Sequence, residues 1–312
     1  MTKETKKNTN YKCGVVSIVG RPNVGKSTLL NAIIGEKVTI VSKIPQTTRN
    51  QIRGIYSDER GQIIFIDTPG LHKKGDTLDK YMNKAASSSM SDADCIIYLV
   101  DTQRRIGEEE ENVILKLKDV KTPIIMGLNK MDKKKGRVDE YIDCWEAAKG
   151  SSVAEMNNFM LITLSAIKEI NIDKLLDVIF DYLPEGPALY PTDIISDTPK
   201  KMVISDIIRE KLFRYMKQEM PHSLGVSIDE MTPIKGKKIL IRATIFVEHE
   251  RQKEIVVGKG GSNLKKIGKE ARVDLEDLLE TGVFLELFVK TQQRWRENQS
   301  LLSELGYDET MM

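Results

Sequence analysis

The sequence predicts a two-domain α/β protein in which a doubly wound, mostly parallel sheet is followed by a smaller α+β module. Three observations predict this class. A β-branched run at 15–19 leads through a glycine loop into an apolar, helix-like stretch at 28–34. Further apolar runs at 62–66, 123–128 and 159–163 end in polar residues, at the strand ends where a doubly wound sheet presents ligand groups. Prolines then interrupt the chain near 184–199, and the segments after them follow the order α-β-β-α-α-β.

Length and composition are consistent with two soluble domains. The chain has 312 residues, of which 40% are apolar and 30% charged, and it contains no run of about 18 apolar residues that could span a membrane. Residues 1–10 lack the apolar core of a secretory signal and are expected to form a disordered tail. Because Cys13, Cys95 and Cys144 form no C-x-x-C pair, we expect reduced thiols in a cytosolic protein and no structural zinc.

The glycine loop has the pattern G-x-x-x-x-G-K-S. A strand before it and a helix after it are the context that a phosphate-binding loop requires, because backbone N–H groups and the helix N-terminus then point at phosphate oxygens. A chance glycine-rich turn would not explain both flanks. Lys26 is expected to reach the β- and γ-phosphates, and the Ser27 hydroxyl to ligate Mg²⁺. The sequence therefore predicts that a nucleoside triphosphate is bound by Gly20, Arg21, Pro22, Asn23, Val24, Gly25, Lys26, Ser27 and Thr28.

A second motif follows a predicted antiparallel hairpin formed by 53–56 and 62–66. It consists of Asp67, Thr68, Pro69 and Gly70. Asp67 is expected to hold Mg²⁺ through water, and the N–H of Gly70 to meet the γ-phosphate. The D-x-x-G pattern is common by itself and becomes informative only with the other motifs.

Two further motifs predict that the base is guanine. Asn129, Lys130, Met131 and Asp132 follow the predicted strand at 123–128. The Asp132 carboxylate can accept two hydrogen bonds from guanine N1–H and the 2-amino group, which adenine cannot supply. Ser165 and Ala166 follow the strand at 159–163, and their backbone is expected to contact guanine O6. Each motif alone could be a polar loop or a helix cap, but together and in this order they predict GTP rather than ATP.

The second domain is expected after a helix at 172–183, because three prolines and a glycine in 184–191 cannot sustain a helix or a central strand. A helix with apolar positions between 204 and 216 leads to strand-like segments at 222–229 and 238–248, a helix from 262 to about 279 and a last strand at 283–289. G-x-x-G at 258–261 lies between two helices, which is typical of the KH loop that clamps the backbone of a short single strand. The alternative is a plain helix–helix turn.

Basic residues surround this loop. The stretch from Arg251 to Arg272 holds seven basic residues and two acidic ones, a local charge of +5. A lysine run alone is more typical of a solvated helix face, but beside a G-x-x-G loop it predicts phosphate contacts. The expected RNA-binding residues are Lys253, Gly258, Lys259, Gly260, Gly261, Lys265 and Lys266.

The motifs of the first half resemble the G1, G3, G4 and G5 motifs of translational-type GTPases, and Ile44-Pro45-Gln46-Thr47-Thr48-Arg49 resembles their switch I segment. This resemblance implies that Thr48, or alternatively Thr47, closes on Mg²⁺ when the γ-phosphate is present. The metal set is then Ser27, Thr48 and Asp67. Leu71 stands where Ras-like enzymes carry a water-orienting glutamine, which implies slow intrinsic hydrolysis.

Asn23 is similar to the asparagine by which some of these GTPases bind K⁺ beside the phosphates, where a cation could replace the charge of an arginine finger. The alternative is that Asn23 only shapes the loop. The residues implied in catalysis are Lys26, Thr48, Asp67, Gly70 and Asn23.

A G domain followed by a type II KH domain resembles the Era family of bacterial ribosome-assembly GTPases over nearly the whole chain after Tyr11. The likeness extends to 184–187, 190–191, 208–212, 219–223, 252–253 and 305–307. Two segments depart from the family pattern: 165–171 lacks the glycine usual before its asparagine, and 248–251 replaces the typical strand end.

The resemblance implies a slow GTPase that binds the 3′ end of 16S ribosomal RNA and assists maturation of the 30S subunit. It also implies a monomer in the cytoplasm that can associate peripherally with the inner face of the cell membrane. The expected domains are a tail at 1–10, a G domain at 11–183, a linker at 184–200 and a KH domain with a C-terminal helix at 201–312. We expect nucleotide state to gate RNA binding: the γ-phosphate orders Thr48 and Gly70, the switches repack against the second domain, and the KH face becomes available.

Two other classes compete with this interpretation. A metabolic P-loop kinase would need a lid and an acceptor pocket, and would not need Asn129–Asp132. An RNA-binding protein whose G domain has lost hydrolysis stays open at this point, because Leu71 removes the most recognisable catalytic group. Phosphate release with and without RNA separates this class from a GTPase.

Overall fold

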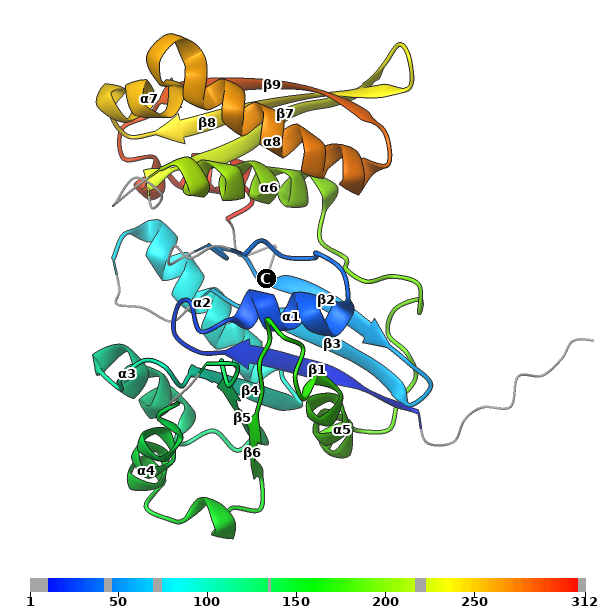
Figure 1. Ribbon diagram of the computed structural model, residues 1–312, viewed down its shortest axis with the longest axis vertical. Helices are drawn as coiled ribbons and strands as arrows, with labels where there is room; N and C mark the ends of the chain where they lie inside the picture. Colours follow the sequence, from blue (N-terminus) through cyan, green and yellow to red (C-terminus); the bar gives the residue numbers. More distant parts are fainter. Residues whose placement is uncertain (1–10, 42–46, 70–74, 134–135, 217–222, 308–312) are drawn as a thin grey trace, which may run out of the picture. The chain divides into compact units, whose positions relative to one another are not determined.

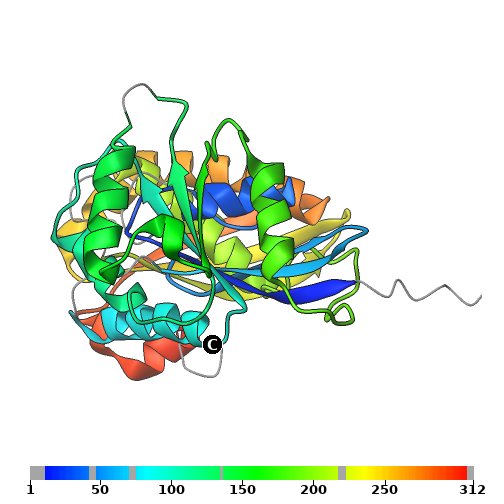
Figure 2. The ribbon, with the colours of Figure 1, turned by 90° about the horizontal axis from the view of Figure 1, so that it is seen from below.

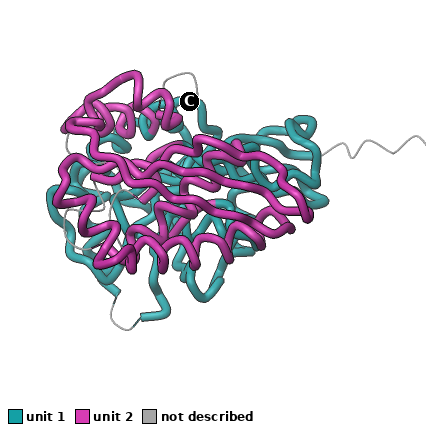
Figure 3. The backbone as a smooth tube through the Cα atoms, turned by 90° about the horizontal axis from the view of Figure 1, so that it is seen from above, with its two compact units in different colours: residues 1–38, 51–72, 86–197 teal, residues 39–50, 73–85, 198–312 magenta. Residues whose placement is uncertain are grey.

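The computed structural model describes residues 11–41, 47–69, 75–133, 136–216 and 223–307. The predicted tail, switch residues 44–46, the segment from Gly70 to His72 and residues 219–222 lie outside the described residues. Contacts divide the chain into two compact units (Figure 3). Of the helices described, none has the length and apolarity needed to cross a membrane.

The first unit is built on a six-stranded sheet with the order β2-β3-β1-β4-β5-β6 (Figure 1). The strands are β1 (Lys12–Val19), β2 (Ile52–Ser57), β3 (Gly61–Asp67), β4 (Cys95–Asp101), β5 (Ile124–Asn129) and β6 (Phe159–Thr163). β2 and β3 form the predicted antiparallel hairpin, and every other pair is parallel. Apolar residues are buried throughout β3 and β4 because helices cover both faces of the sheet. The predicted doubly wound fold is confirmed.

Helices on the two faces make two separate cores (Figure 2). α1 (Lys26–Ile34) and α5 (Ile172–Tyr182) pack on one face. α3 (Glu108–Leu117), α4 (Val138–Lys149) and the C-terminal part of α2 (Thr77–Ser91) pack on the other. In the sheet register Ile18 lies opposite Asp67, and Asp101 lies opposite Asn129. The carboxyl ends of β1, β3, β4 and β5 therefore meet at one edge, which is where the predicted motifs begin.

The proline-rich segment after α5 packs along β2 and β3 and belongs to the first unit up to residue 197. Ile55 donates its N–H to the carbonyl of Ile195 at 2.8 Å. The side-chain oxygen of Gln62 accepts the N–H groups of Leu189 and Tyr190, each at 2.9 Å. A segment whose prolines cannot join a sheet is thus fixed by hydrogen bonds to buried Gln62.

The second unit contains the predicted order α-β-β-α-α-β. Its elements are α6 (Lys200–Tyr215), β7 (Gly225–Ile234), β8 (Lys238–Val247), α7 (Glu250–Val257), α8 (Ser262–Leu279), β9 (Gly282–Thr291) and α9 (Gln299–Glu304). β8 pairs antiparallel with β7 and parallel with β9, and the apolar sides of α6 and α8 cover one face of this sheet. β8 ends at Val247, one residue before the predicted strand end at 248, and α7 begins at Glu250.

Two segments from the first half of the sequence also belong to the second unit. They are 39–50 and 73–85, drawn with 198–312 in Figure 3. From α2, Leu78, Tyr81 and Met82 join a buried cluster with residues of β8 and the C-terminal region, namely Phe246, Trp295, Leu301, Leu302, Leu305 and Tyr307. Residues 39–50, which follow α1, and residues 73–85, which follow the D-x-x-G motif, therefore pack with the KH elements. The predicted G domain at 11–183 includes both segments, and its bounds stay a prediction.

Candidate functional site

The loop between β1 and α1 has the backbone of a phosphate-binding loop. Gly20, Asn23 and Gly25 are left-handed, with φ of 156°, 63° and 108°. A Cβ at Gly20 would lie 2.3 Å from the carbonyl oxygen of Leu99, and one at Gly25 would lie 2.5 Å from Nδ2 of Asn129. Glycine is therefore required at both positions for the loop to lie against β4 and β5. α1 begins directly after Gly25 and presents its N–H groups and positive dipole end to this loop.

Lys26, Ser27 and Asp67 come together at the start of α1. Nζ of Lys26 donates to the carbonyls of Gly20 and Arg21 at 3.0 and 3.2 Å, which holds the ammonium group at the loop. Burial lowers the pKa of Lys26, and the carboxylates of Asp67 and Glu110 oppose that effect. The Ser27 hydroxyl donates to Oδ2 of Asp67 at 2.7 Å. A hydroxyl and a carboxylate at this separation form an oxygen donor pair of the kind that Mg²⁺ prefers beside phosphates.

The predicted guanine motif adjoins the same loop. Nδ2 of Asn129 donates to the carbonyl of Val24 at 2.8 Å, and its Oδ1 accepts the N–H of Ala166 at 3.0 Å. Asn129 thus ties the phosphate loop to the segment after β6. The Ser165 hydroxyl donates to Oδ1 of Asp132 at 2.6 Å. This hydrogen bond lowers the pKa of Asp132, so its exposed carboxylate is an ionised acceptor at neutral pH.

Other predicted residues are placed differently. Asn23 is exposed, and its carbonyl accepts Nζ of Lys130 at 3.0 Å. Thr47 and Thr48 are buried within the second unit. Gly70 and Leu71 lie outside the described residues. The structure therefore brings together the residues that were predicted to bind phosphate, metal and base. Their roles stay predictions, as do those of Asn23, Thr48 and Gly70.

The G-x-x-G loop joins α7 to α8 in the second unit. Gly258, Gly260 and Gly261 all have positive φ, at 71°, 58° and 78°. A Cβ at Gly258 would lie 2.8 Å from the Asn263 side chain, whereas one at Gly260 or Gly261 would have no neighbour within 4 Å. The loop is thus tight on its protein side and open on its outer side, where a sugar-phosphate backbone could approach closely.

A groove of about 560 Å³ begins at this loop and runs between α8 and β9. Lys265, Lys269 and Arg272 supply its basic side chains. The rest of the described lining is apolar or glycine, and consists of Gly261, Leu264, Gly268, Val283, Phe284, Leu285 and Leu287. A positive wall and an apolar floor suit a single strand that presents phosphates on one side and bases on the other.

This groove modifies the predicted RNA set. Of the four predicted lysines, Lys265 lines the groove, whereas Lys253, Lys259 and Lys266 are not part of its described lining. Lys269 and Arg272 belong to the basic stretch but not to the predicted RNA-binding residues. They could have been found, because positions 265, 269 and 272 lie on one side of a helix.

Comparison with known proteins identifies the family. Residues 15–130 match the model of the family described as 50S ribosome-binding GTPase, and residues 219–296 match that of the KH domain. A variant of Era from Aquifex aeolicus, solved with GDP and AlF4⁻, is 37% identical, with 95% of this chain and 99% of that chain covered and a TM-score of 0.87. Era solved with MgGDPNP and nucleotides 1506–1542 of 16S ribosomal RNA is 36% identical, with the same coverage and a TM-score of 0.89. The chain belongs to the Era family. Its fold and its GTPase class, which the sequence predicted, are thereby confirmed.

A buried ion pair behind the phosphate loop of this Era family member was not predicted. Nε of Arg21 lies 2.9 Å from Oε2 of Glu110, and both side chains are almost fully buried. Nη2 of Arg21 also donates to the Tyr141 hydroxyl at 2.9 Å, and the Tyr98 hydroxyl donates to Oε1 of Glu110 at 2.6 Å. Burial raises the pKa of Glu110, while the hydrogen bond from Tyr98 and the Arg21 guanidinium oppose that effect. The Arg21 side chain therefore anchors the loop from behind, and no sequence spacing indicates this contact.

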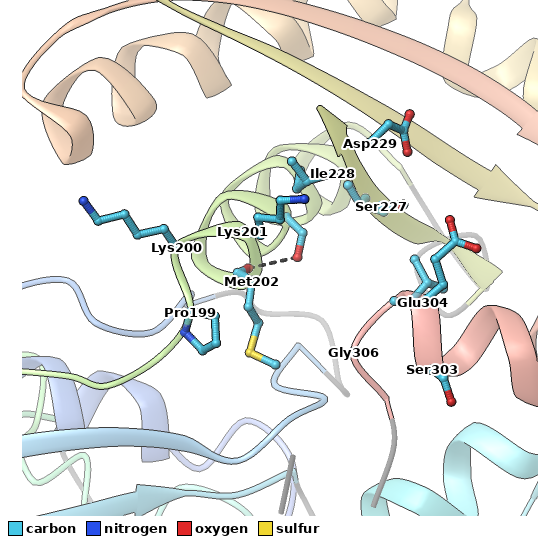
Figure 4. Close-up of a pocket in the computed structure, with 13 residues that line it drawn as sticks. Pro199, Lys200, Lys201, Met202, Ser227, Ile228, Asp229, Ser303, Glu304 and Gly306 are labelled. Carbon is cyan, nitrogen blue, oxygen red and sulfur yellow. Dashed lines mark hydrogen bonds between the residues drawn. The ribbon is translucent and has the colours of Figure 1, made fainter. Parts of the chain in front are cut away.

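A second cavity of this Era family member, of about 520 Å³, lies between the start of α6, β7 and α9 (Figure 4). Lys200 and Lys201 are among its lining residues, but so are Asp229 and Glu304. Because carboxylates would repel phosphate groups, this cavity is less suited to an RNA backbone than the groove between α8 and β9.

Proposed function

We propose that this protein is a GTP-binding and GTP-hydrolysing switch that binds the 3′ end of 16S ribosomal RNA and assists assembly of the 30S subunit. The observation that carries the proposal is the composition of the second unit. It contains both the basic groove beside G-x-x-G and the two segments, 39–50 and 73–85, that follow the nucleotide motifs in the sequence.

The nucleotide part of the proposal assigns a role to each polar group of the first unit. The loop N–H groups and Lys26 bind the phosphates, and Asp132 accepts the guanine N–H groups. Ser27 and Asp67 would hold Mg²⁺, which when bound neutralises charge on the β- and γ-phosphates. The proposal includes slow intrinsic turnover, and Thr48 as the switch residue that joins the metal set.

The RNA part assigns the loop glycines and the basic groove to a single strand. Gly260 and Gly261 admit the sugar-phosphate backbone, while Lys265, Lys269 and Arg272 bind phosphates along α8. The relative solved with nucleotides 1506–1542 of 16S ribosomal RNA supports this choice of ligand.

Three arginines connect the segments 39–50 and 73–85 to the KH elements inside the second unit. Nη1 of Arg49 donates to the carbonyl of Leu224 at 2.6 Å, and its guanidinium lies 5.8 Å from the ring centre of Trp295. From α6, Nη2 of Arg209 donates to the carbonyl of Thr47 at 2.9 Å. Arg296 pairs with two aspartates of the segment 73–85, Asp76 at 2.6 Å and Asp79 at 3.1 Å.

These contacts continue toward the G-x-x-G loop. Nε1 of Trp295 donates to the carbonyl of Ser223 at 2.9 Å, and the Ser223 hydroxyl accepts Nε2 of Gln252 at 3.0 Å. Oε1 of Gln252 accepts the N–H groups of Glu248 and His249, which closes the start of α7. Because α7 ends at Val257, directly before Gly258, the segment Ser223–Leu224 lies between Arg49 and the helix that leads into the loop. We infer that γ-phosphate binding, by drawing Thr48 toward the metal, changes the contacts of Arg49 and thereby the RNA groove.

Measuring RNA affinity in two nucleotide states tests this function. We expect the full chain to bind a single-stranded RNA from the 3′ end of 16S ribosomal RNA with affinities that differ between GDP and a non-hydrolysable GTP analogue. Ser27→Ala should bind the same RNA but lose most of that difference, because it removes a metal ligand without touching the groove. Equal affinities of the parent in both states would contradict the switch, and absence of RNA binding would contradict the function.

The location of the protein is part of the proposal. We propose a cytoplasmic protein that associates peripherally with the inner face of the cell membrane, as the family resemblance implies.

A further inference from the structure

A cavity of about 430 Å³ in the first unit has no part in the proposed function. Ile124 and Phe159, the first residues of β5 and β6, are among the residues that line it. Asn129 ends β5 and Ser165 follows β6, so the cavity lies at the sheet edge opposite the guanine motif. A molecule bound there would not occupy the nucleotide site.

The buried side of this cavity is apolar and partly aromatic. The rings of Trp145 and Phe159 stack with their centres 5.1 Å apart and their planes at 17°. Ile124 is also buried, while Met156 is partly exposed. The unbranched side chain of methionine adapts its shape to an apolar neighbour. This side of the cavity therefore suits the apolar body of a small molecule.

The charged groups in the described lining of the cavity are two lysines, and no carboxylate is among them. Lys121 is exposed and has no ion pair or hydrogen bond with a described residue. Lys149 is partly buried, and its Nζ lies 5.5 Å from the ring centre of Trp145. This Nζ donates to the carbonyl of Lys118 at 2.6 Å, and an ammonium group has further N–H donors to offer. The charge of the cavity therefore favours an anion.

Trp145 also has an unused hydrogen-bond donor. Its side chain is fully buried, and Nε1 has no hydrogen-bond partner among the described residues. Buried donors are nearly always paired, because an unpaired one has lost its hydrogen bond to water without a replacement. Since Trp145 lines the cavity, an acceptor that enters can supply the missing partner. A carboxylate offers two acceptor oxygens for a single charge, so it can bond to this N–H and to Lys149 together.

We propose that this cavity binds a small carboxylic acid with an apolar body, whose carboxylate pairs with the two lysines and accepts the indole N–H of Trp145. Its volume is within the range of small-molecule sites, about 300–1,000 Å³. The inference goes beyond the proposed function, because this lining shares no residue with the nucleotide motifs or with the basic groove.

The test uses the full chain and a matched series of probes. Phenylpropanoate, phenylpropanol and phenylpropylamine share an apolar body and differ in charge. The sequence contains two tryptophans, so an NMR spectrum of indole N–H groups has two signals, which Trp145→Phe or Trp295→Phe assigns. Trp295 lies in the second unit, where its Nε1 donates to the carbonyl of Ser223. Phenylpropanoate should move the Trp145 signal alone, and should bind at least about tenfold more tightly than the alcohol or the amine.

Three variants and one control locate the site. Lys149→Met removes the partly buried charge and should weaken phenylpropanoate binding by about 10- to 100-fold. Lys121→Gln should weaken it by about 2- to 5-fold, because exposed ion pairs contribute less. Ser151→Phe enlarges an exposed lining residue and should obstruct the cavity. Lys174→Gln changes an exposed lysine of α5, on the other face of the sheet, and should bind like the parent.

Several outcomes would overturn the proposal. An unmoved Trp145 signal at millimolar phenylpropanoate, or equal binding of the alcohol, would exclude a carboxylate site. Parent-like binding by Lys149→Met and Lys121→Gln together, or by Ser151→Phe, would place any binding elsewhere. Equal shifts of the Trp145 and Trp295 signals would show non-specific binding. None of these outcomes affects the proposed function, because nucleotide and RNA binding are measured without the probes.

Discussion

Replacing Arg49 by methionine should uncouple RNA affinity from nucleotide state. Arg49 is 1% exposed, and it joins the switch I segment to Leu224 and Trp295. Burial lowers its pKa to about 10, which still leaves it charged at neutral pH. Methionine fills much of the same volume without the charge or the donors, so Arg49→Met removes the polar interactions and keeps most of the apolar packing.

The size of the effect can be worked from two of the interactions that methionine cannot make, the hydrogen bond to Leu224 and the cation–π contact with Trp295. A hydrogen bond from a charged donor contributes about 1.5–3 kcal/mol, and a cation–π interaction about 0.5–2 kcal/mol. Removal of a buried charge offsets part of this loss. We therefore expect the docking of 39–50 in the second unit to weaken by about 1–4 kcal/mol. Coupling free energies between two sites are typically ~1–3 kcal/mol, or 5- to 150-fold in affinity, so this loss is large enough to remove the coupling.

The assay is the ratio of RNA affinities measured with GDP and with a non-hydrolysable GTP analogue. In Arg49→Met the ratio should fall to within about threefold of one, whichever state binds RNA more tightly in the parent. Nucleotide affinity should not change, because Lys26, Ser27 and Asp132 are untouched. Arg53→Met is the matched control: Arg53 is partly exposed and pairs with Asp197 inside the first unit, and such surface pairs contribute ~0–1 kcal/mol. A parent-like ratio in a folded Arg49→Met protein would refute the proposed route.

Three further variants test the other assignments. Asp132→Asn should shift nucleotide preference from GTP toward xanthosine triphosphate, because the 2-oxo group of xanthine needs a hydrogen-bond donor. Unchanged GTP affinity would argue against Asp132 as the acceptor for guanine. Hydrolysis should slow when Na⁺ replaces K⁺ at fixed ionic strength, and Asn23→Ala should abolish that difference; equal parent rates in both salts would leave Asn23 as a loop residue only. Lys259→Asp combined with Gly260→Asp should sharply reduce RNA affinity and flatten its salt dependence. Basal GTP hydrolysis should persist, because Lys26 and Asp67 lie in the other unit. RNA binding as tight as that of the parent would exclude G-x-x-G as the clamp.

The elements that the sequence predicted are those whose signal is local. Glycines with positive φ, a strand before them and a helix after them are consecutive in the chain, so Gly20–Ser27 could be placed without tertiary information. The apolar strands that end at Asp67 and Asn129 are also continuous runs. By contrast, α3 starts with four glutamates, and only one narrow side of the helix is buried. Acidic residues at the N-terminus favour a helix. The apolar pattern of α3, however, is too weak to predict the helix from the sequence.

Contacts between distant residues could not be predicted in this way. Ser223 and Gln252 are 29 residues apart, and Arg49 and Leu224 are 175 apart. A polar residue in a loop looks the same in sequence whether it is solvated or buried against a carbonyl. For this reason the sequence predicts that 39–50 and 73–85 belong with the neighbouring strands. Leu78, Tyr81 and Met82 are buried against C-terminal residues, and this contact becomes visible only in the folded structure.

The two buried arginine–carboxylate pairs are better explained by position than by stability. Arg21 pairs with Glu110 behind the phosphate loop, and Arg209 pairs with Asp206 at 2.7 Å where it also holds the carbonyl of Thr47. Apolar residues of similar volume often stabilise a core as well as or better than a buried ion pair, because desolvation offsets much of the attraction. Each arginine, however, also binds an oxygen that an apolar residue could not bind: Arg21 the carbonyl of Arg105, and Arg209 the carbonyl of Thr47. A guanidinium held on one side by a carboxylate and on the other by a loop carbonyl fixes that loop in one conformation. Arg21 thereby also fixes the phosphate loop to which it belongs, and Arg209 fixes the segment 39–50, which the proposed coupling to RNA requires.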